Sequence, residues 1–263
     1  SVEAGREFME VASEVTKKKP IVALKSGKTK AGARAAVSHT GAIAGSDRIY
    51  ETVFKQVGIV RAKDMEEFFD MGKALAFQPP ATGNNIAIIT DAGGPGIMAA
   101  DECESKGLKI KSFSDETTRK IEKMKTEGKI PKFATDVNPL DLTGSATSEM
   151  FQYAAKILLE DYEIHGIIVL GMHHLPALQQ DFVDRIANLA RNQTKPVVAC
   201  DIGETEMALF IRSRFDKLRI PSYFSPEDAA RSMSALVEYG DYLKEQHCFE
   251  QYLDNFLQRR PCK

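Results

Sequence analysis

A glycine-rich segment in the middle of the chain has the composition of an anion-binding turn. It reads TDAGGPG at residues 90–96 and lies between an apolar run typical of a strand, Ile86–Ile89, and a segment typical of a helix. Because glycine has no Cβ atom, its backbone N–H group can face a ligand, and the helix dipole stabilises negative charge there. We therefore predict that Gly93, Gly94 and Gly96 bind phosphate or a similar anion. The alternative is a tight turn in which glycine serves packing alone.

A histidine among small residues could act as a nucleophile. His39 lies in the sequence AVSHTGAIAGS at residues 36–46, next to the hydroxyl groups of Ser38 and Thr40. Imidazole titrates near neutral pH, so its neutral, nucleophilic form is available. The small neighbours allow a substrate or a partner surface to approach closely. The alternative is a polar loop histidine that only packs or caps.

Two short motifs resemble nucleotide-binding signatures. The sequence GKT at residues 27–29 resembles the end of a phosphate-binding Walker A loop, but the glycine required five positions earlier is replaced by Val22. The sequence GPGIMA at residues 94–99 fits a loose dinucleotide fingerprint. The matching acidic residue would be Asp115, which does not clearly end a second strand. A dinucleotide-binding oxidoreductase therefore stays an alternative.

Other polar residues are weaker candidates. His173 and His174 follow the apolar run Gly166–Leu170 and should lie near the same edge of a sheet, although two adjacent side chains diverge and rarely share one metal. We expect no metal site. Asn138 and Asp141 lie in a proline-containing loop, where a structural turn and support of a phosphate site are both open.

The segment around His39 lies between alternating helices and strands. Apolar periodicity predicts helices at residues 2–18, 46–56 and 65–75 and strands at residues 21–24 and 59–61. Residues 26–46 show no clear period and predict a long functional loop. Two strands are few for an independent sheet, so we expect residues 1–80 to be a partial, N-terminally truncated domain.

A second alternating series follows a proline-rich linker at residues 77–83. It predicts strands at residues 86–89, 108–110, 166–170, 196–199 and 220–223, and helices at residues 96–106, 115–125, 149–159, 180–191, 205–214 and 226–240. Continuous apolar strands between amphipathic helices indicate a parallel sheet covered on both faces. We predict the α/β class, with a flavodoxin-like domain at residues 83–241 and a helical tail at residues 242–263.

Composition excludes several classes of protein. The 263 residues include 43% hydrophobic and 27% charged residues, and the net charge of −2 gives no electrostatic footprint for nucleic acid or an anionic membrane. We expect no nucleic-acid and no membrane partner. The four cysteines form no CxxC pair, and the N-terminal residues lack a secretion signal, so we expect a cytoplasmic protein.

Four sequence blocks together resemble one family. They are KPIVALKSG at residues 19–27, SHTGAIAGSD at 38–47, TDAGGPG at 90–96 and NPLDLTG at 138–144. In this order they resemble the NDP-forming acyl-CoA synthetases, whose type is the ADP-forming acetate–CoA ligase, a relative of succinyl-CoA synthetase. The resemblance covers the chain to about residue 241 and corresponds to the family's ligase domains only.

The resemblance implies a reversible reaction in which acyl-CoA, phosphate and ADP give the free acid, CoA and ATP. An acyl phosphate forms first, and a histidine then carries its phosphoryl group to ADP. The matching histidine is His39, so residues 1–80 correspond to the phosphohistidine domain. Ser38, Thr40 and Gly41 are expected to contact the phosphoryl group. In the family the glycine-rich helix start of the next ligase domain, here residues 93–96, meets the phosphohistidine loop.

The resemblance also implies partners. CoA and ADP or ATP with Mg²⁺ would be substrates of the full enzyme, bound mainly outside this sequence. An N-terminal CoA-binding domain and an ATP-grasp domain or subunit are expected, and neither is recognisable here, so we expect a hetero-oligomer acting on a small acid or its CoA thioester. A non-catalytic, synthetase-like regulatory module of a lysine acetyltransferase is the alternative.

Overall fold

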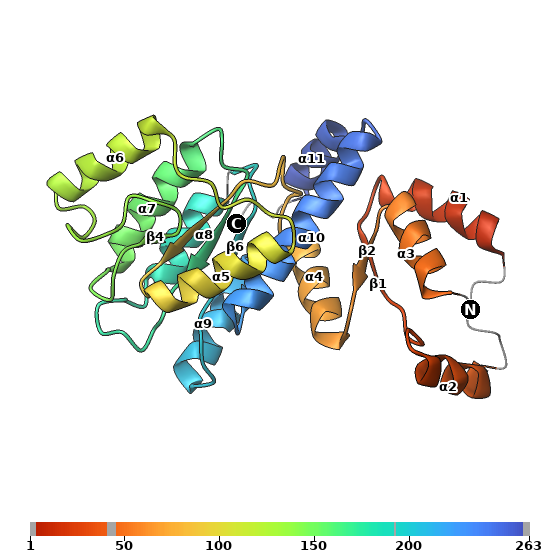
Figure 1. The fold of residues 1–263 in the computed structure, drawn as a ribbon. Helices are drawn as coiled ribbons and strands as arrows, with labels where there is room; N and C mark the ends of the chain where they lie inside the picture. Colours follow the sequence, from red (N-terminus) through yellow and green to blue (C-terminus); the bar gives the residue numbers. More distant parts are fainter. Residues whose placement is uncertain (1–3, 41–45, 192, 260–263) are drawn as a thin grey trace. The chain divides into compact units, whose positions relative to one another are not determined.

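A computed structural model describes residues 4–40, 46–191 and 193–259 (Figure 1). The chain divides into two compact units, the first made of residues up to Gly72 and from Glu238 on, and the second of Lys73–Val237. The boundaries fall inside helix α4 (Met65–Phe77) and helix α10 (Pro226–Glu245). The first boundary therefore lies upstream of the predicted linker at residues 77–83.

The first unit contains a two-stranded parallel sheet. Strand β1 (Ile21–Leu24) pairs with strand β2 (Ile59–Ala62), and Ile21 lies opposite Ile59. The accompanying helices are α1 (Gly5–Thr16), α2 (Lys30–Thr40), α3 (Asp47–Gln56), the start of α4, the end of α10, and α11 (Phe249–Gln258). Its small core joins α1, α3 and β2 through Ala12, Phe54, Val57 and Ile59.

Helix α2 replaces most of the predicted loop. The loop prediction was wrong for residues 30–40, while residues 41–45 lie outside the described residues. Four alanines in this stretch favour a helix, and the Oγ1 of Thr29 accepts a hydrogen bond from the N–H of Gly32 at its start (3.1 Å). The described side chains of α2 are exposed or half-buried. A helix without a buried face has no apolar period to reveal it.

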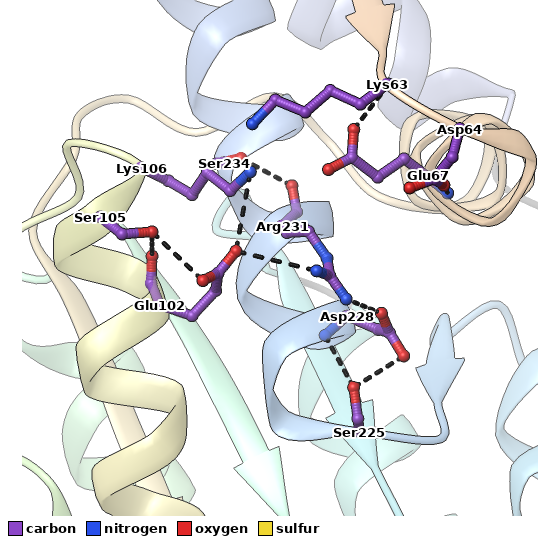
Figure 2. Close-up of polar contacts among 10 residues, drawn as sticks. All are labelled: Lys63, Asp64, Glu67, Glu102, Ser105, Lys106, Ser225, Asp228, Arg231 and Ser234. Atoms are coloured by element: carbon purple, nitrogen blue, oxygen red, sulfur yellow. Dashed lines mark hydrogen bonds and ion pairs between the residues drawn. The ribbon is translucent and has the colours of Figure 1, made fainter.

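Residues near the C-terminus complete the first unit. The Oγ1 of Thr16 in α1 donates to the carbonyl of Val57 (2.6 Å) and lies 2.9 Å from the hydroxyl of Tyr242. The hydroxyl of Tyr239 donates to the carbonyl of Thr16 (2.6 Å). These buried contacts tie the end of α10 to α1. At the start of α4, Glu67 and Asp64 form a reciprocal cap, in which Glu67 accepts from the N–H of Lys63 (2.8 Å; Figure 2).

The second unit is built on a five-stranded parallel sheet with the order β4-β3-β5-β6-β7. The strands are β3 (Ile86–Thr90), β4 (Leu140–Asp141), β5 (Gly166–Leu170), β6 (Val197–Cys200) and β7 (Ser222–Tyr223). Counted along the chain, this order is second, first, third, fourth, fifth, which is the flavodoxin-like arrangement. The predicted fold class is thereby confirmed.

Helices cover both faces of this sheet (Figure 1). They are α5 (Gly93–Ser105), α6 (Asp115–Thr126), α7 (Ser148–Glu160), α8 (Phe182–Ala190), α9 (Glu206–Lys217) and the start of α10. Alternate strand residues such as Ala87 and Ile89 pack with Phe151 of α7 and Phe182 of α8 in one buried cluster. Helix α5 contributes nothing to that cluster and lies on the opposite face.

The edge of the sheet beside β3 differs from the prediction. The expected strand at residues 108–110 is wrong, because Lys109 forms only an isolated bridge with Asn85. The side chain of Asn138 instead pairs with the edge of β3, accepting from the N–H of Ile88 (3.0 Å) and donating to the carbonyl of Ile86 (2.8 Å). The two-residue β4 follows it and was missed, because two residues show no period.

Candidate functional site

The glycine-rich turn lies at the carboxyl end of β3. Thr90 fixes its entry, because the Oγ1 of Thr90 accepts from the N–H of Ala92 (3.0 Å) and donates to the carbonyl of Ala92 (2.8 Å). Ala92 is extended, and α5 starts at the next residue, with Gly93 and Gly94 exposed. The N–H groups of a helix's first turn have no partner inside the helix. The turn therefore has the geometry of an anion site, next to the point where the strand order reverses.

The three predicted glycines differ in their surroundings. A Cβ atom on Gly94 would meet no other atom within 4 Å, whereas one on Gly93 would lie 3.0 Å from Oδ2 of Asp141. A Cβ on Gly96 would lie 3.0 Å from Cγ2 of Thr90, and the N–H of Gly96 donates to the carbonyl of Ala92 (3.3 Å). Gly96 thus explains the close packing of α5 on β3. Gly93 and Gly94 are left as the donors that could reach an anion.

The other end of α5 is held by ion pairs with α10 (Figure 2). The Oε1 of Glu102 lies 4.0 Å from Nη1 of Arg231 and 3.6 Å from Nζ of Lys106. Arg231 also pairs with Asp228, whose Oδ2 accepts from the hydroxyl of Ser225 (2.7 Å). Partly exposed pairs of this kind contribute roughly 0.5 kcal/mol each. Together these contacts hold α5 against α10 and so help to orient the helix axis.

Asp91 follows β3 directly and is 2% exposed. Its Oδ2 accepts a hydrogen bond from the N–H of Met172 (3.0 Å), in the loop after β5. The pKa of Asp91 is raised from 3.8 to about 6, mainly by burial; the hydrogen bond from Met172 opposes this rise, and the charges of Asp201 and His173 have smaller effects that raise and lower the pKa respectively. Its Oδ1 has no hydrogen-bond partner. Asp91 is not among the site residues predicted from the sequence.

His173 and Asp201 form a buried pair beside Asp91. Nδ1 of His173 contacts Oδ2 of Asp201, and the two side chains are 4% and 1% exposed. A carboxylate on Nδ1 holds an imidazole in the tautomer that leaves Nε2 free. The Nε2 of His173 and the Oδ1 of Asp201 have no hydrogen-bond partner. We call Asp91, His173 and Asp201 the polar cluster; they follow the neighbouring strands β3, β5 and β6.

The sequence held a partial signal for the polar cluster. Asp91 and Asp201 each follow directly after a fully buried strand. His173 lies near this edge of the sheet, as predicted, but the sequence pattern did not distinguish it from His174, which is exposed. Asp141 also lies at this edge, beside Gly93, and its Oδ1 accepts from the N–H of Thr143 (2.8 Å).

The residues around His39 belong to the first unit, and the glycine-rich turn belongs to the second. The backbone of His39 lies in the last turn of α2, which ends at Thr40. Ser38 is exposed, and its Oγ donates to the carbonyl of Arg34 (3.2 Å). Gly41, the remaining predicted phosphate contact, lies outside the described residues.

The structure also bears on a dinucleotide site, a metal site and a membrane-spanning helix. Asp115 is the first residue of α6 and follows no strand, so the dinucleotide pattern lacks an acidic residue at a strand end. Within residues 4–40, 46–191 and 193–259, no three His, Cys, Asp or Glu residues are arranged to hold a metal ion. No helix in these ranges is both long and apolar enough to cross a membrane.

Comparison with protein families gives two matches in order along the chain. Residues 1–75 match the Succinyl-CoA ligase like flavodoxin domain, and residues 86–236 match the Ligase-CoA domain. The alpha subunit of acetate–CoA ligase (ADP-forming) II of Pyrococcus furiosus is 38% identical over an alignment of 246 residues, and the match covers 90% of this chain and 51% of that protein. The acetate–CoA ligase (ADP-forming) of Methanocaldococcus jannaschii is 35% identical over 254 residues, 95% of this chain and 35% of that protein.

A solved structure agrees with these matches. Acetyl-coenzyme A synthetase 1 of Ca. Korarchaeum cryptofilum, in complex with phosphate and ADP, superposes with a TM-score of 0.79 at 32% identity and covers 100% of this chain and 54% of its own. The chain thus spans about half the length, or less, of the proteins it matches. The family resemblance predicted from the four sequence blocks is confirmed: the chain belongs to the CoA ligase family in which a succinyl-CoA ligase-like flavodoxin domain precedes a Ligase-CoA domain.

Proposed function

We propose that this chain is the phosphoryl-handling part of an ADP-forming acyl-CoA synthetase. The enzyme would convert acyl-CoA, phosphate and ADP into the free acid, CoA and ATP. The relatives are named as ADP-forming CoA ligases, and the solved neighbour is described with phosphate and ADP. The observation that carries the proposal is the first turn of α5, which presents Gly93 and Gly94 at the carboxyl edge of the sheet.

The proposed chemistry has three balanced steps. Phosphate attacks the thioester carbonyl of acyl-CoA, giving an acyl phosphate and CoA. A nitrogen of His39 then attacks the phosphorus and releases the acid as carboxylate. Finally the phosphohistidine transfers its phosphoryl group to the terminal phosphate oxygen of ADP and regenerates imidazole. In each phosphoryl transfer, negative charge is spread over the oxygens of the transferred group, so fixed N–H donors at these oxygens lower the barrier.

The residues in this proposal have separate roles. His39 carries the phosphoryl group, and Ser38, Thr40 and Gly41 contact it in the first unit. Gly93 and Gly94 donate their N–H groups in the second unit, and Gly96 lets α5 pack on β3 closely enough to place them. The proposal thus assigns the phosphoryl group to a histidine in the last turn of α2 rather than in a long loop.

The proposal includes further protein parts and substrates. An ATP-grasp domain or subunit would bind ADP or ATP with Mg²⁺, and a CoA-binding domain would hold the thioester. The support is that the relatives are about twice to three times as long as the matched region and that one is an alpha subunit. A cytoplasmic location fits the free thiols of Cys103, Cys200 and Cys248.

Turnover by the native assembly tests this function. The chain would be tagged in its own organism and isolated with the proteins that accompany it. ATP formation from ADP and phosphate would then be measured with a series of acyl-CoA thioesters. We expect ATP that depends on both phosphate and thioester, lost in a His39→Asn variant and retained in a His174→Asn variant. An assembly that forms ATP with none of the thioesters would contradict the proposal and favour a non-catalytic module.

A further inference from the structure

The polar cluster lies beside the candidate anion site but has no part in the proposed chemistry. Three of its polar atoms, Oδ1 of Asp91, Nε2 of His173 and Oδ1 of Asp201, are buried without a hydrogen-bond partner. Leaving a buried polar atom unpaired costs about 1–3 kcal/mol. Three such atoms at adjacent strand ends point to a function, because polar groups kept against this cost are concentrated at functional sites.

The cluster is connected directly to the glycine-rich turn. Asp91 is the residue before Ala92, which caps α5, and its carboxylate holds the N–H of Met172. His173 follows Met172 in the chain and contacts Asp201 through Nδ1. A change of charge on Asp91 is therefore felt both at the first turn of α5 and at the loop after β5.

The charges around the cluster are mostly negative. Asp141 reaches the turn from β4, with Oδ2 3.0 Å from the Cβ position of Gly93. On the side of β6, Arg212 of α9 donates to the carbonyls of Asp201 (2.7 Å) and Gly203 (2.6 Å) and pairs with Glu204 (3.2 Å).

The other acidic groups of α5 are further along the helix, where Glu102 is paired with Arg231 and Lys106. The carboxylates of Asp91, Asp141 and Asp201 thus follow or end neighbouring strands, and the positive group described near them is the guanidinium of Arg212. A phosphoryl dianion at Gly93 and Gly94 would add negative charge to this set, and like charges repel strongly where water is excluded.

We propose that Asp91, held by the N–H of Met172 beside the buried pair of His173 and Asp201, takes up a proton when an anion binds at the first turn of α5, so that anion binding is coupled to pH. The inference rests on the proposed phosphate site. A proton from solvent would form an O–H bond on Asp91, most directly at Oδ1, and cancel its charge. The protonated group is then a hydrogen-bond donor.

Burial of Asp91 and the added charge of a bound anion would together bring this proton uptake near neutral pH. The pKa of Asp91 is already about 6 because of burial, and a second negative charge nearby raises a carboxyl pKa further. Asp91 would thus be largely ionised in the free chain at neutral pH and become protonated when the anion binds. Because the coupling is reciprocal, a lower pH must tighten anion binding.

Calorimetric titration with sulfate tests the inference on the full 263-residue chain. Sulfate is a tetrahedral dianion that, unlike phosphate, carries no titrating proton near neutral pH. We expect its Kd to weaken by about tenfold between about pH 5 and pH 8, which corresponds to one displaced pKa unit. Heats measured in two buffers of different ionisation enthalpy should show uptake of up to about one proton.

Substituted variants identify the residue that takes up the proton. Asp91→Asn should bind sulfate with a Kd that does not depend on pH. The matched control is Asp101→Asn, which removes the same charge from an exposed position on α5 and should keep the wild-type pH dependence. His173→Asn should move the midpoint of the pH dependence upward, because the charge of His173 lowers the pKa of Asp91. A merely structural role of His173 would leave that midpoint in place.

The outcomes separate this inference from the proposed function. Sulfate binding with no proton uptake and no pH dependence in the wild-type chain would overturn the coupling and leave the anion site intact. Sulfate binding at no pH would overturn both. If Asp91→Asn does not fold, the proton count of the wild-type chain still decides.

Discussion

The backbone N–H of Met172 donates a 3.0 Å hydrogen bond to Oδ2 of Asp91, joining the loop after β5 to the end of β3. These two strands are neighbours in the sheet although β4 lies between them in the chain. The bond therefore crosses the point at which the strand order reverses, where open α/β sheets place their ligands. The hydrogen bond also stabilises the ionised form of a buried carboxylate, but it does not fully offset the cost of burying that charge. The remaining cost should be measurable in the free energy of unfolding.

Replacing Asp91 with Asn should stabilise the chain near neutral pH. The folded-state pKa of Asp91 is about 6, above its ordinary value of 3.8. Between these values the folded state binds more protons than the unfolded state, so stability falls as pH rises through this window. Above about pH 6 the cost is on the order of 3 kcal/mol, and Asn avoids it while its oxygen can still accept from Met172. Urea denaturation from about pH 3 to about pH 8 measures the difference.

The difference between Asp91→Asn and wild type should shrink as the pH falls and disappear at about pH 3, where Asp91 is largely neutral in both states. Asp101→Asn, exposed on the same helix, serves as the control and should track wild type throughout. An equal difference between Asp91→Asn and wild type at every pH would show that ionisation of Asp91 is not its cause.

Alanine at Gly94 and at Gly96 should have opposite effects on stability. Gly94 has open space around its Cβ position, so Gly94→Ala should gain up to about 1 kcal/mol of helix stability. The Cβ of Gly96→Ala would press on the buried Thr90 at 3.0 Å, and the chain should lose about 1 kcal/mol or more. Thermal unfolding of both variants at one pH measures this. Equal stabilisation by the two changes would contradict the close packing of α5 on β3.

The Gly94→Ala variant also separates an effect on fold stability from an effect on sulfate affinity. Gly94→Ala places a methyl group beside the exposed first-turn N–H groups and should weaken sulfate binding several-fold, although it stabilises the fold. Unchanged sulfate affinity in Gly94→Ala would place the bound anion away from the exposed side of the first turn.

Gly58→Ala should strongly destabilise the first unit. Gly58 has a φ of 71°, and a Cβ there would overlap the ring of Tyr242. An L-residue at that φ is strained, and the ring is held by the contact of its hydroxyl with Thr16, so a loss of more than about 3 kcal/mol is expected. Gly5→Ala, with nothing within 4 Å of the new methyl group, is the control. Chemical denaturation of the two variants measures the contrast, and a mild effect of Gly58→Ala would refute the packing of Tyr242 on this turn.

The central sheet could be predicted from the sequence because its strands are buried on both faces. Strands β3, β5 and β6 are continuous apolar runs, so their residue types alone identify them. The turn at residues 90–96 was found for a related reason, since several glycines between a strand and a helix have few structural explanations. The family resemblance likewise rested on short blocks of sequence, each local in the chain.

The missed features depend on tertiary contacts. Helix α2 buries too little surface to show a period, and β4 exists only because Asn138 and Leu140 pair with an edge that the sequence does not reveal. The polar cluster could not be predicted because it requires three strand ends to be adjacent. Asp201 meets His173 across 28 positions in the chain, and no local pattern contains that information.

Direct phosphorylation of the chain tests the central claim, that His39 carries the phosphoryl group. The chain would be exposed to phosphoramidate, and phosphate would be mapped by mass spectrometry under mildly alkaline conditions, with His39→Asn and His174→Asn as matched variants. We predict acid-labile phosphate on His39 that persists in His174→Asn and disappears in His39→Asn. Phosphate spread over all histidines, or found on others but not on His39, would contradict the claim.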